Sequence, residues 1–352
     1  MVGPDGELPL PWLEPVLRRT LDSQHAHALL LHGPQGIGQF ELALVLAQAW
    51  LCEAAHGAAR PCGVCASCRL VQAHSHPDLL VLVPEALQES LQWGAADADE
   101  ATSARAAKTK PSQEIKVEAV RAAVSFAQTT SARGRGKVVV LHPAERMNVV
   151  SANTLLKTLE EPPGNARFVL SCAASEALLP TIRSRCQNVV MSLPPPQQAV
   201  EWLAREGVAD PDVMLAATGG QPQEALAWAR QGIDAALWLR VPALVGQGAA
   251  APFAAWPVPR VIDALQKLCH DAARVAAGAA PRYFPASTLS GGANPAALSA
   301  WMRELGRVSR HAEHPWNVGL MVESLILQGQ RALIGASRDG AYVQAVSVHL
   351  RR

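Results

Sequence analysis

Four of the seven cysteines lie between residues 52 and 68, and their spacing is typical of a metal site. They are Cys52, Cys62, Cys65 and Cys68. One tight loop could bring these four thiolates around a tetrahedral ion, as in structural zinc sites. Four protein ligands leave no open coordination position for water, so we expect a structural Zn²⁺ and no catalytic metal. An iron–sulfur cluster, which needs a further cysteine where Gln72 stands, and a redox pair, which needs only two, fit the pattern less well.

A glycine-rich segment with Gly33, Gly36 and Gly38 has the frame of the G-x-x-x-x-G-K-[ST] phosphate-binding loop. In that loop, backbone N–H groups cradle phosphates, a lysine pairs with the β and γ oxygens, and a hydroxyl binds Mg²⁺. Here Gln39 replaces the lysine and Phe40 replaces the hydroxyl residue. A neutral amide and a phenyl ring supply neither the charge nor the metal ligand, so we expect no ATP to be bound.

A second position that ATP hydrolysis requires is also altered. In a P-loop enzyme, the apolar run 138–141 would end in an acidic pair that holds Mg²⁺ and polarises water, but here it ends in His142 and Pro143. Taken alone, the glycine-rich segment could serve only as a tight strand-to-helix turn. Two independent departures together indicate a nucleotide-binding architecture that has lost its hydrolytic function.

These residues require a scaffold of alternating strands and helices. Runs rich in leucine or β-branched residues predict strands at 28–32, 79–83, 137–141, 167–171 and 187–191. Amphipathic patterns between them predict helices near 40–51, 115–128, 151–160 and 176–183. This alternation predicts a three-layer α/β domain around a parallel sheet.

Proline content and hydrophobic periodicity divide the chain into three expected domains, at 1–193, 194–236 and 237–352. The first is the α/β domain, with the metal module at 52–68 and a flexible insertion at 84–112 that is rich in Ala, Ser, Thr and charged residues. Three consecutive prolines end the strand pattern. Only helical periods follow, which predict a three-helix unit and then an all-helical domain.

The charge balance limits the classes of partner. Lys and Arg number 31 against 30 Asp and Glu, which gives a formal net charge of +1. Such a chain has no overall field to hold a polyanion or an acidic membrane, so any nucleic-acid contact must be local. No apolar run approaches the ~20 residues that span a bilayer, and the first residues lack the pattern of a signal peptide. We therefore expect a soluble cytoplasmic protein with no membrane partner.

Three further motifs are more specific. Residues 155–163 are LLKTLEEPP, residues 168–171 are FVLS, and residues 181–186 are TIRSRC. Together with the altered phosphate loop and the four cysteines, they resemble the clamp-loader branch of the AAA+ superfamily, over about residues 11–333. The resemblance implies an AAA+-like P-loop domain with a zinc-binding insertion, a small three-helix lid domain and an all-α C-terminal collar domain for subunit assembly.

The resemblance also implies a role for Ser184, Arg185 and Cys186. In this family the arginine of the triplet acts as a finger that reaches the γ-phosphate bound by a neighbouring ATPase subunit, a contact that can be worth about 10³ to 10⁵ in rate. Arginine suits this role because its guanidinium is planar, permanently charged and bidentate toward phosphate. Without the resemblance, Arg183 and Arg185 would be interpreted as a solvated basic helix end.

Gln223 stands where the family has a nucleotide-sensing arginine, which is a third loss of charge for handling ATP. The resemblance therefore implies a non-hydrolysing stator that activates ATP turnover in its neighbours. Its implied partners are the clamp-loader ATPase subunits and the clamp-opening subunit, and more distantly the sliding clamp and primer–template DNA. The alternatives are an autonomous ATP-driven AAA+ remodeller and a zinc-organised nucleic-acid-binding module.

Overall fold

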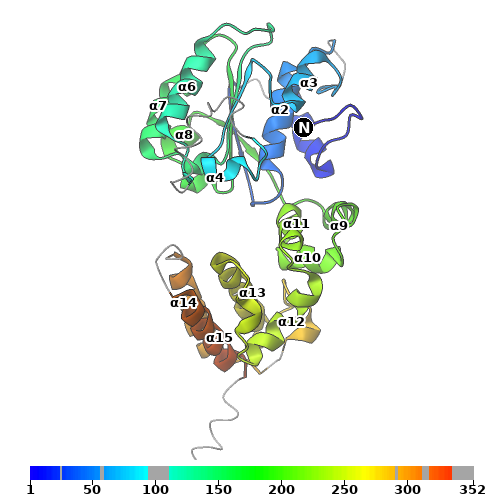
Figure 1. Ribbon diagram of the computed structural model, residues 1–352, viewed down its shortest axis with the longest axis vertical. Coiled ribbons are helices and arrows are strands. Elements are labelled where there is room, and N and C mark those ends of the chain that lie inside the picture. Colours follow the sequence, from blue (N-terminus) through cyan, green and yellow to red (C-terminus); the bar gives the residue numbers. More distant parts are fainter. Residues whose placement is uncertain (24–25, 56–58, 94–110, 290–291, 311–316, 335–352) are drawn as a thin grey trace, which may run out of the picture. The chain divides into compact units, whose positions relative to one another are not determined.

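The computed structural model describes residues 1–23, 26–55, 59–93, 111–289, 292–310 and 317–334 (Figure 1). The described chain forms two compact units. The first comprises Met1–Trp202 and Gln221–Glu224, and the second comprises Leu203–Gly220 and the described residues from Ala225 onward. The three-domain division at 1–193, 194–236 and 237–352 stays a prediction. Residues 94–110, most of the expected insertion at 84–112, lie outside the described residues.

A five-stranded parallel sheet forms the centre of the first unit. Its strands are β1 (Ala28–His32), β2 (Leu79–Leu82), β3 (Val138–Leu141), β4 (Arg167–Cys172) and β5 (Gln187–Val190). They are ordered β2-β3-β4-β1-β5, so β1 lies between β4 and β5 and Leu30 pairs with both Leu170 and Asn188. The inner strands β1, β3 and β4 are buried almost throughout, as expected of a parallel sheet with both faces covered. The predicted parallel α/β architecture is confirmed.

Helices cover both faces of this sheet. The helices of the first unit are α1 (Glu14–Ser23), α2 (Gln39–Leu51), α3 (Ala66–Gln72), α4 (Glu85–Gln88), α6 (Val117–Gln128), α7 (Val149–Glu160) and α8 (Pro180–Arg183), with α9 (Pro196–Arg205) beginning in it. Figure 1 shows α6 and α7 on one face, and α2 and α3 on the other. The α6 and α7 face buries Val120, Leu155 and Leu159 against Phe168 and Leu170 of β4. Short 3-10 turns at Pro11–Leu13, Ala144–Arg146 and Ser175–Ala177 complete the unit.

Every regular element that the structure describes after β5 is a helix. The second unit contains α10 (Pro211–Ala217), most of α11 (Pro222–Arg230), α12 (Ala235–Gly246), α13 (Val258–Ala276), α14 (Pro295–Arg310) and α15 (Val318–Ile334), with 3-10 turns at Ala251–Phe253 and Ala286–Thr288. Fully buried tryptophans fill its interior. The ring centroids of Trp228 and Trp238 lie 5.1 Å apart, and the ring of Trp238 stacks on that of Phe284 with 4.5 Å between centroids. None of the described helices is both long and apolar enough to cross a membrane.

Close packing between α14 and α15 depends on a glycine. Trp301 is buried in α14, and its indole nitrogen donates a 2.9 Å hydrogen bond to the carbonyl oxygen of Leu325 in α15. A Cβ added at Gly329 would lie 2.5 Å from Cζ2 of Trp301. The indole therefore occupies the space that a side chain at position 329 would need.

Candidate functional site

The glycine-rich loop joins the end of β1 to the start of α2. Gly38 has φ +102°, a left-handed conformation that residues with a Cβ rarely adopt. A Cβ added at Gly33 would lie 2.1 Å from the carbonyl oxygen of Met191, so only glycine fits there. The glycine frame of a phosphate-binding loop is therefore required by the backbone and its neighbours.

Gln39, at the position of the usual lysine, folds back onto its own loop. Its Nε2 atom donates hydrogen bonds of 2.8 Å to the carbonyl oxygen of Gly33 and 2.5 Å to that of Pro34. The side chain is buried, with 6% of the residue exposed. Both amide hydrogens are thus directed to the loop itself, and the residue brings no positive charge to a bound phosphate.

Phe40 and His142 form an aromatic contact beyond this loop. Phe40 is buried, and the centroids of the two rings lie 4.9 Å apart. Nδ1 of His142 lies 2.9 Å from Oγ of Ser171 in β4, within hydrogen-bond distance. Burial lowers the pKa of His142 to about 4, so the imidazole is neutral at physiological pH. Neither side chain is suited to hold Mg²⁺ by a hydroxyl or a carboxylate.

Trp93 was missed as a neighbour of this site, because it lies in the segment interpreted as a flexible insertion. Its ring makes an edge contact with Phe40 at 6.4 Å between centroids and stacks on His74 at 3.9 Å. The described residues 84–93 also include α4, where Glu85 accepts from the backbone N–H of Ser112 at 3.0 Å. The large aromatic side chain of Trp93 within this polar segment could have indicated a packed residue.

The first residues of α11 lie against the loop, within the first unit. The backbone N–H of Gln223 donates to the carbonyl oxygen of Gly36 at 3.2 Å. Its side-chain Nε2 donates to Oε1 of Glu41, in the first turn of α2, at 2.6 Å. The structure therefore brings Gln223 to the phosphate loop, where it bonds to the protein through neutral amides.

The four clustered cysteines converge at one point. All four Sγ atoms lie within 4.8 Å of one another, with 3.9 Å between Cys52 and Cys65 and 4.0 Å between Cys62 and Cys68. Four sulfurs around Zn²⁺ at ~2.3 Å would be separated by about 3.8 Å. Cys52 follows α2, and the Sγ of Cys65 caps α3 by accepting from the N–H of Cys68. The cluster can hold a metal ion, and its dimensions fit Zn²⁺.

The pKa values of the clustered thiols depart from the usual value in both directions. Burial raises the pKa of Cys52 and of Cys68. At Cys62 burial has the same effect, but hydrogen bonds from the N–H groups of Val64 and Cys65 and from the side chains of Cys52 and Cys65 together outweigh it and bring the pKa to about 6. A divalent cation bound by the four sulfurs would stabilise the deprotonated, thiolate forms that act as its ligands.

A network of polar contacts links this cluster to the turn 131–136. Glu53, next to Cys52, accepts from Nε of Arg133 at 2.8 Å and forms an ion pair with its Nη2 at 2.6 Å. Nε of Arg133 also lies 3.0 Å from Oγ of Ser67, between Cys65 and Cys68. One guanidinium thus contacts both ends of the cysteine module.

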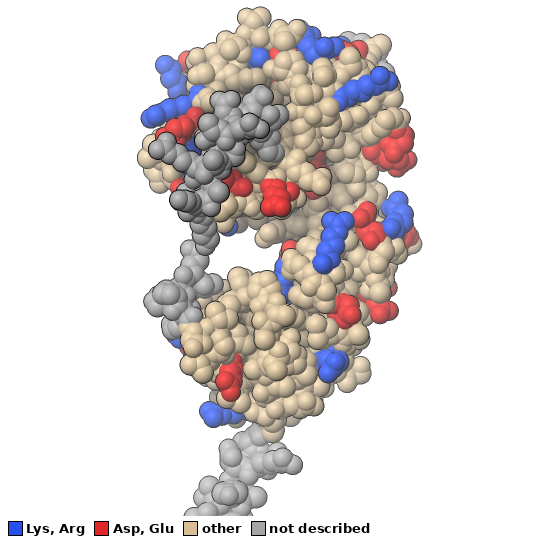
Figure 2. Space-filling model, viewed as in Figure 1, with Lys and Arg blue, Asp and Glu red and all other residues tan. Residues whose placement is uncertain are grey.

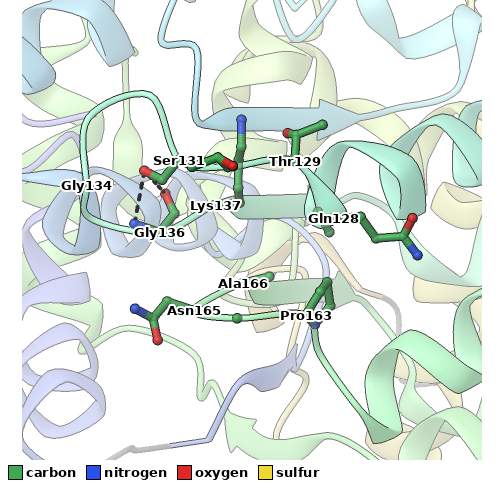
Figure 3. Close-up of a pocket in the computed structure, with 12 residues that line it drawn as sticks. Gln128, Thr129, Ser131, Gly134, Gly136, Lys137, Pro163, Asn165 and Ala166 are labelled. Carbon is green, nitrogen blue, oxygen red and sulfur yellow. Dashed lines mark hydrogen bonds between the residues drawn. The ribbon is translucent and has the colours of Figure 1, made fainter.

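Asp78 holds the same turn from the sheet side. It is fully buried and accepts from the N–H groups of Ala132 at 2.8 Å and Arg133 at 2.9 Å. Lys137 forms a buried ion pair with it at 3.1 Å. A cavity of about 290 Å³ lies beside this turn, as Figure 3 shows, and Asn165 lines its other side.

Arg185 lies between α8 and β5, and its guanidinium contacts residues of its own chain. Its Nη2 forms an ion pair with Oε1 of Glu160, at the end of α7. Its Nη1 donates to the carbonyl oxygen of Thr181 at 2.9 Å and lies 3.4 Å from Oγ of Ser184. The side chain is 28% exposed. Burial raises the pKa of Cys186 to about 12, so this neighbouring thiol is protonated and unreactive.

Arg185 and the phosphate loop lie at opposite ends of the strands: the loop lies at their C-terminal ends and Arg185 at their N-terminal ends. The loop follows the last residue of β1, whereas Arg185 precedes the first residue of β5, and the two strands are parallel neighbours. Five residues of strand span about 16 Å. The structure therefore does not bring Arg185 to this chain's own phosphate loop.

Comparison with known proteins decides the family. The family model described as "DNA polymerase III, delta subunit" matches residues 13–195. A relative from Escherichia coli, DNA polymerase III subunit delta', is 33% identical over 287 residues, which cover 75% of this chain and 78% of the relative. The chain belongs to the DNA polymerase III delta' family. The resemblance stated from the LLKTLEEPP and SRC motifs is thereby confirmed.

Other relatives agree with this assignment to the delta' family. DNA polymerase III subunit delta' of Pseudomonas aeruginosa is 40% identical over 215 residues, 60% of this chain and 58% of the relative. The match thus spans less than two thirds of that protein. The solved structure of a DNA polymerase III gamma subunit-related protein from Thermotoga maritima covers 91% of this chain and 99% of its own, with TM-score 0.50 and 16% identity. That likeness supports the fold alone.

Proposed function

We propose that this chain is the delta' subunit of a DNA polymerase III clamp loader, a stator without ATPase activity of its own. In this role it supplies Arg185 as an arginine finger to ATP bound by a neighbouring ATPase subunit, while a sliding clamp is loaded onto primed DNA. The observation that carries the proposal is that Arg185 lies at the N-terminal ends of the strands, whereas the chain's own phosphate loop lies at their C-terminal ends. A guanidinium there is too far from the chain's own phosphate loop to act on a nucleotide in it, which supports a target in a neighbouring subunit.

The altered phosphate loop supports the same division of labour. Gln39, Phe40 and His142 replace the groups that pair with phosphate, bind Mg²⁺ and polarise water, and each is engaged with the protein. ATP would therefore be turned over in the neighbouring subunits. The geometry of these three residues disfavours an autonomous ATP-driven remodeller.

The cysteine cluster is proposed to hold a structural Zn²⁺, bound by Cys52, Cys62, Cys65 and Cys68. The ion would stabilise the module that joins α2 to α3. The helical second unit would supply the lid and collar that the family uses for assembly. On the face shown in Figure 2, basic and acidic side chains are scattered among uncharged ones, and this face gives no support to a separate nucleic-acid-binding module.

The direct test is Arg185→Ala in a clamp loader reconstituted with its ATPase subunits. We expect DNA-dependent ATP turnover to fall by at least about tenfold, because a lost arginine finger can cost about 10³ to 10⁵ in rate, while assembly measured by size-exclusion chromatography is unchanged. Arg183→Ala, in the same helix end, is the matched control and should leave turnover within about twofold. Loss of assembly, or undiminished turnover, would contradict the finger.

A further inference from the structure

The guanidinium of Arg185 is already committed to acceptors within its own chain. Nη2 is paired with the carboxylate of Glu160, and Nη1 is bonded to the carbonyl oxygen of Thr181. A finger that engages a neighbour's γ-phosphate must direct these same outer N–H groups toward it. The observed conformation is therefore a held state, distinct from the state that contacts phosphate.

This held state is only partly satisfied. The Nε atom of Arg185 is buried, and no acceptor for it is found in the described chain. A buried N–H without a partner costs free energy that a different side-chain position can recover. The carboxylate of Glu160 is 49% exposed, so water competes for it and the ion pair is weak. Both features make the guanidinium easy to release.

From this geometry we propose that Glu160 is a positioning residue that holds Arg185 in reserve until ATP is bound next door. The inference rests on the proposed function, because it concerns the same guanidinium. Carboxylate and phosphate both match the fork of arginine, so the two ligands compete for the same N–H groups. The exchange is favoured when a γ-phosphate brings additional negative charge within reach.

The competition between Glu160 and phosphate for Arg185 determines whether removing the charge of Glu160 raises or lowers kcat/KM for ATP. Because Glu160 stabilises the free subunit and not the phosphate-bound finger, its removal lowers the cost of reaching the transition state from free enzyme and ATP. An exposed ion pair contributes at most about a fivefold factor to an equilibrium. We therefore expect kcat/KM for ATP to rise by about two- to fivefold when Glu160 loses its charge.

The test compares Glu160→Gln with Glu161→Gln in the reconstituted clamp loader with primed DNA. Both substitutions keep the side-chain volume, and both positions are exposed at the end of α7. We expect Glu160→Gln to raise kcat/KM and Glu161→Gln to leave it unchanged. A structural defect would lower the activity, so an increase separates holding from damage.

A second measurement uses the full chain alone. Phenylglyoxal modifies accessible guanidinium groups, and peptide mass spectrometry reports the rate at Arg185, with Arg183 as the internal reference. We expect faster modification of Arg185 in Glu160→Gln and no change in Glu161→Gln. This readout tests the hold without any ATPase subunit.

The outcomes separate this inference from the proposed function. If Glu160→Gln leaves both kcat/KM and the modification rate unchanged, or lowers kcat/KM toward the Arg185→Ala level, Glu160 does not hold the finger in reserve. If Arg185→Ala itself leaves ATP turnover intact, the finger is wrong, whatever the modification rate shows.

Discussion

Gln39 donates a 2.8 Å hydrogen bond to the carbonyl oxygen of Gly33, six residues earlier in the same loop. The equivalent lysine of a working phosphate loop would extend toward the β and γ oxygens of a nucleotide. Here the residue closes the loop on itself, and the same loop is contacted by the backbone of Gln223. The loop is thus stabilised by hydrogen bonds within the protein.

The first prediction concerns nucleotide binding. Titration of the isolated chain with a fluorescent ATP analogue and Mg²⁺ should show no saturable binding. Gln39→Lys should not restore it, because Phe40 still fills the place of the hydroxyl ligand and His142 that of the acidic residue. Saturable, Mg²⁺-dependent binding by the unaltered chain would contradict the proposed stator.

A second prediction uses a pair of helical glycines. Gly329→Ala should destabilise the protein by about 1–3 kcal/mol, because its Cβ would lie 2.5 Å from Trp301. Gly306→Ala, in α14, meets only the end of Arg310 at 3.8 Å and should stabilise by about 0.5–1 kcal/mol through helix propensity. Denaturant unfolding measures both. Equal effects at the two positions would show that Trp301 does not fill this space.

The pH dependence of stability should contain a contribution from His142. Its pKa is about 4 in the folded protein and about 6.5 in an unfolded chain, so the unfolded state binds more protons between these values. Stability contributed by the neutral imidazole is therefore present above pH 6.5 and is lost as the pH falls toward 4.

Urea unfolding at pH 7 and pH 5 checks this contribution. The unaltered protein should lose about 1–2 kcal/mol more than His142→Phe over this interval. Comparing the two proteins cancels the effects of other groups, including the cysteine thiols. An identical pH dependence would mean that His142 titrates normally.

Metal removal should change the stability of the protein and the hydrogen exchange of the turn 131–136, which lies outside the cysteine module. Treatment with a zinc chelator should lower the melting temperature and, through Glu53 and Ser67, loosen the turn that contains Arg133. Hydrogen exchange at the amides of Ala132 and Arg133 should accelerate by about two- to fivefold, since a partly exposed ion pair is lost while Asp78 remains.

Arg133→Gln is the matching variant for this coupling. It should reproduce the faster exchange at the turn while the protein retains its metal, measured by elemental analysis. If chelation leaves exchange at the turn unchanged while metal is lost, the network does not transmit the state of the cluster.

The strands were predictable because most of them are short runs rich in leucine or β-branched residues between polar or glycine-rich segments. The runs at 28–32, 79–83 and 187–191 match β1, β2 and β5 to within a residue at each end. The buried inner strands β1, β3 and β4 leave this signal most directly in the sequence. The cysteine cluster was predictable for a similar reason, because most of its ligands are close in the sequence.

The partners of the candidate residues were not predictable. Glu160 and Arg185 are 25 residues apart, and their pairing depends on how α7 and α8 pack. The sequence showed that Gln39 is not a lysine, but not that its amide turns back to Gly33. Such contacts are set by tertiary packing, which local periodicity does not encode.

The position of β1 at the middle of the sheet also constrains the order of folding. Leu29 pairs with Val169 on one side and Gln187 on the other, so both partners are synthesised long after β1 itself. Closing such long loops costs entropy before any ladder is formed, which slows folding. During synthesis, the apolar strand β1 must therefore wait for the SRC triplet and β5 to leave the ribosome, a period in which a chaperone would have an exposed segment to bind.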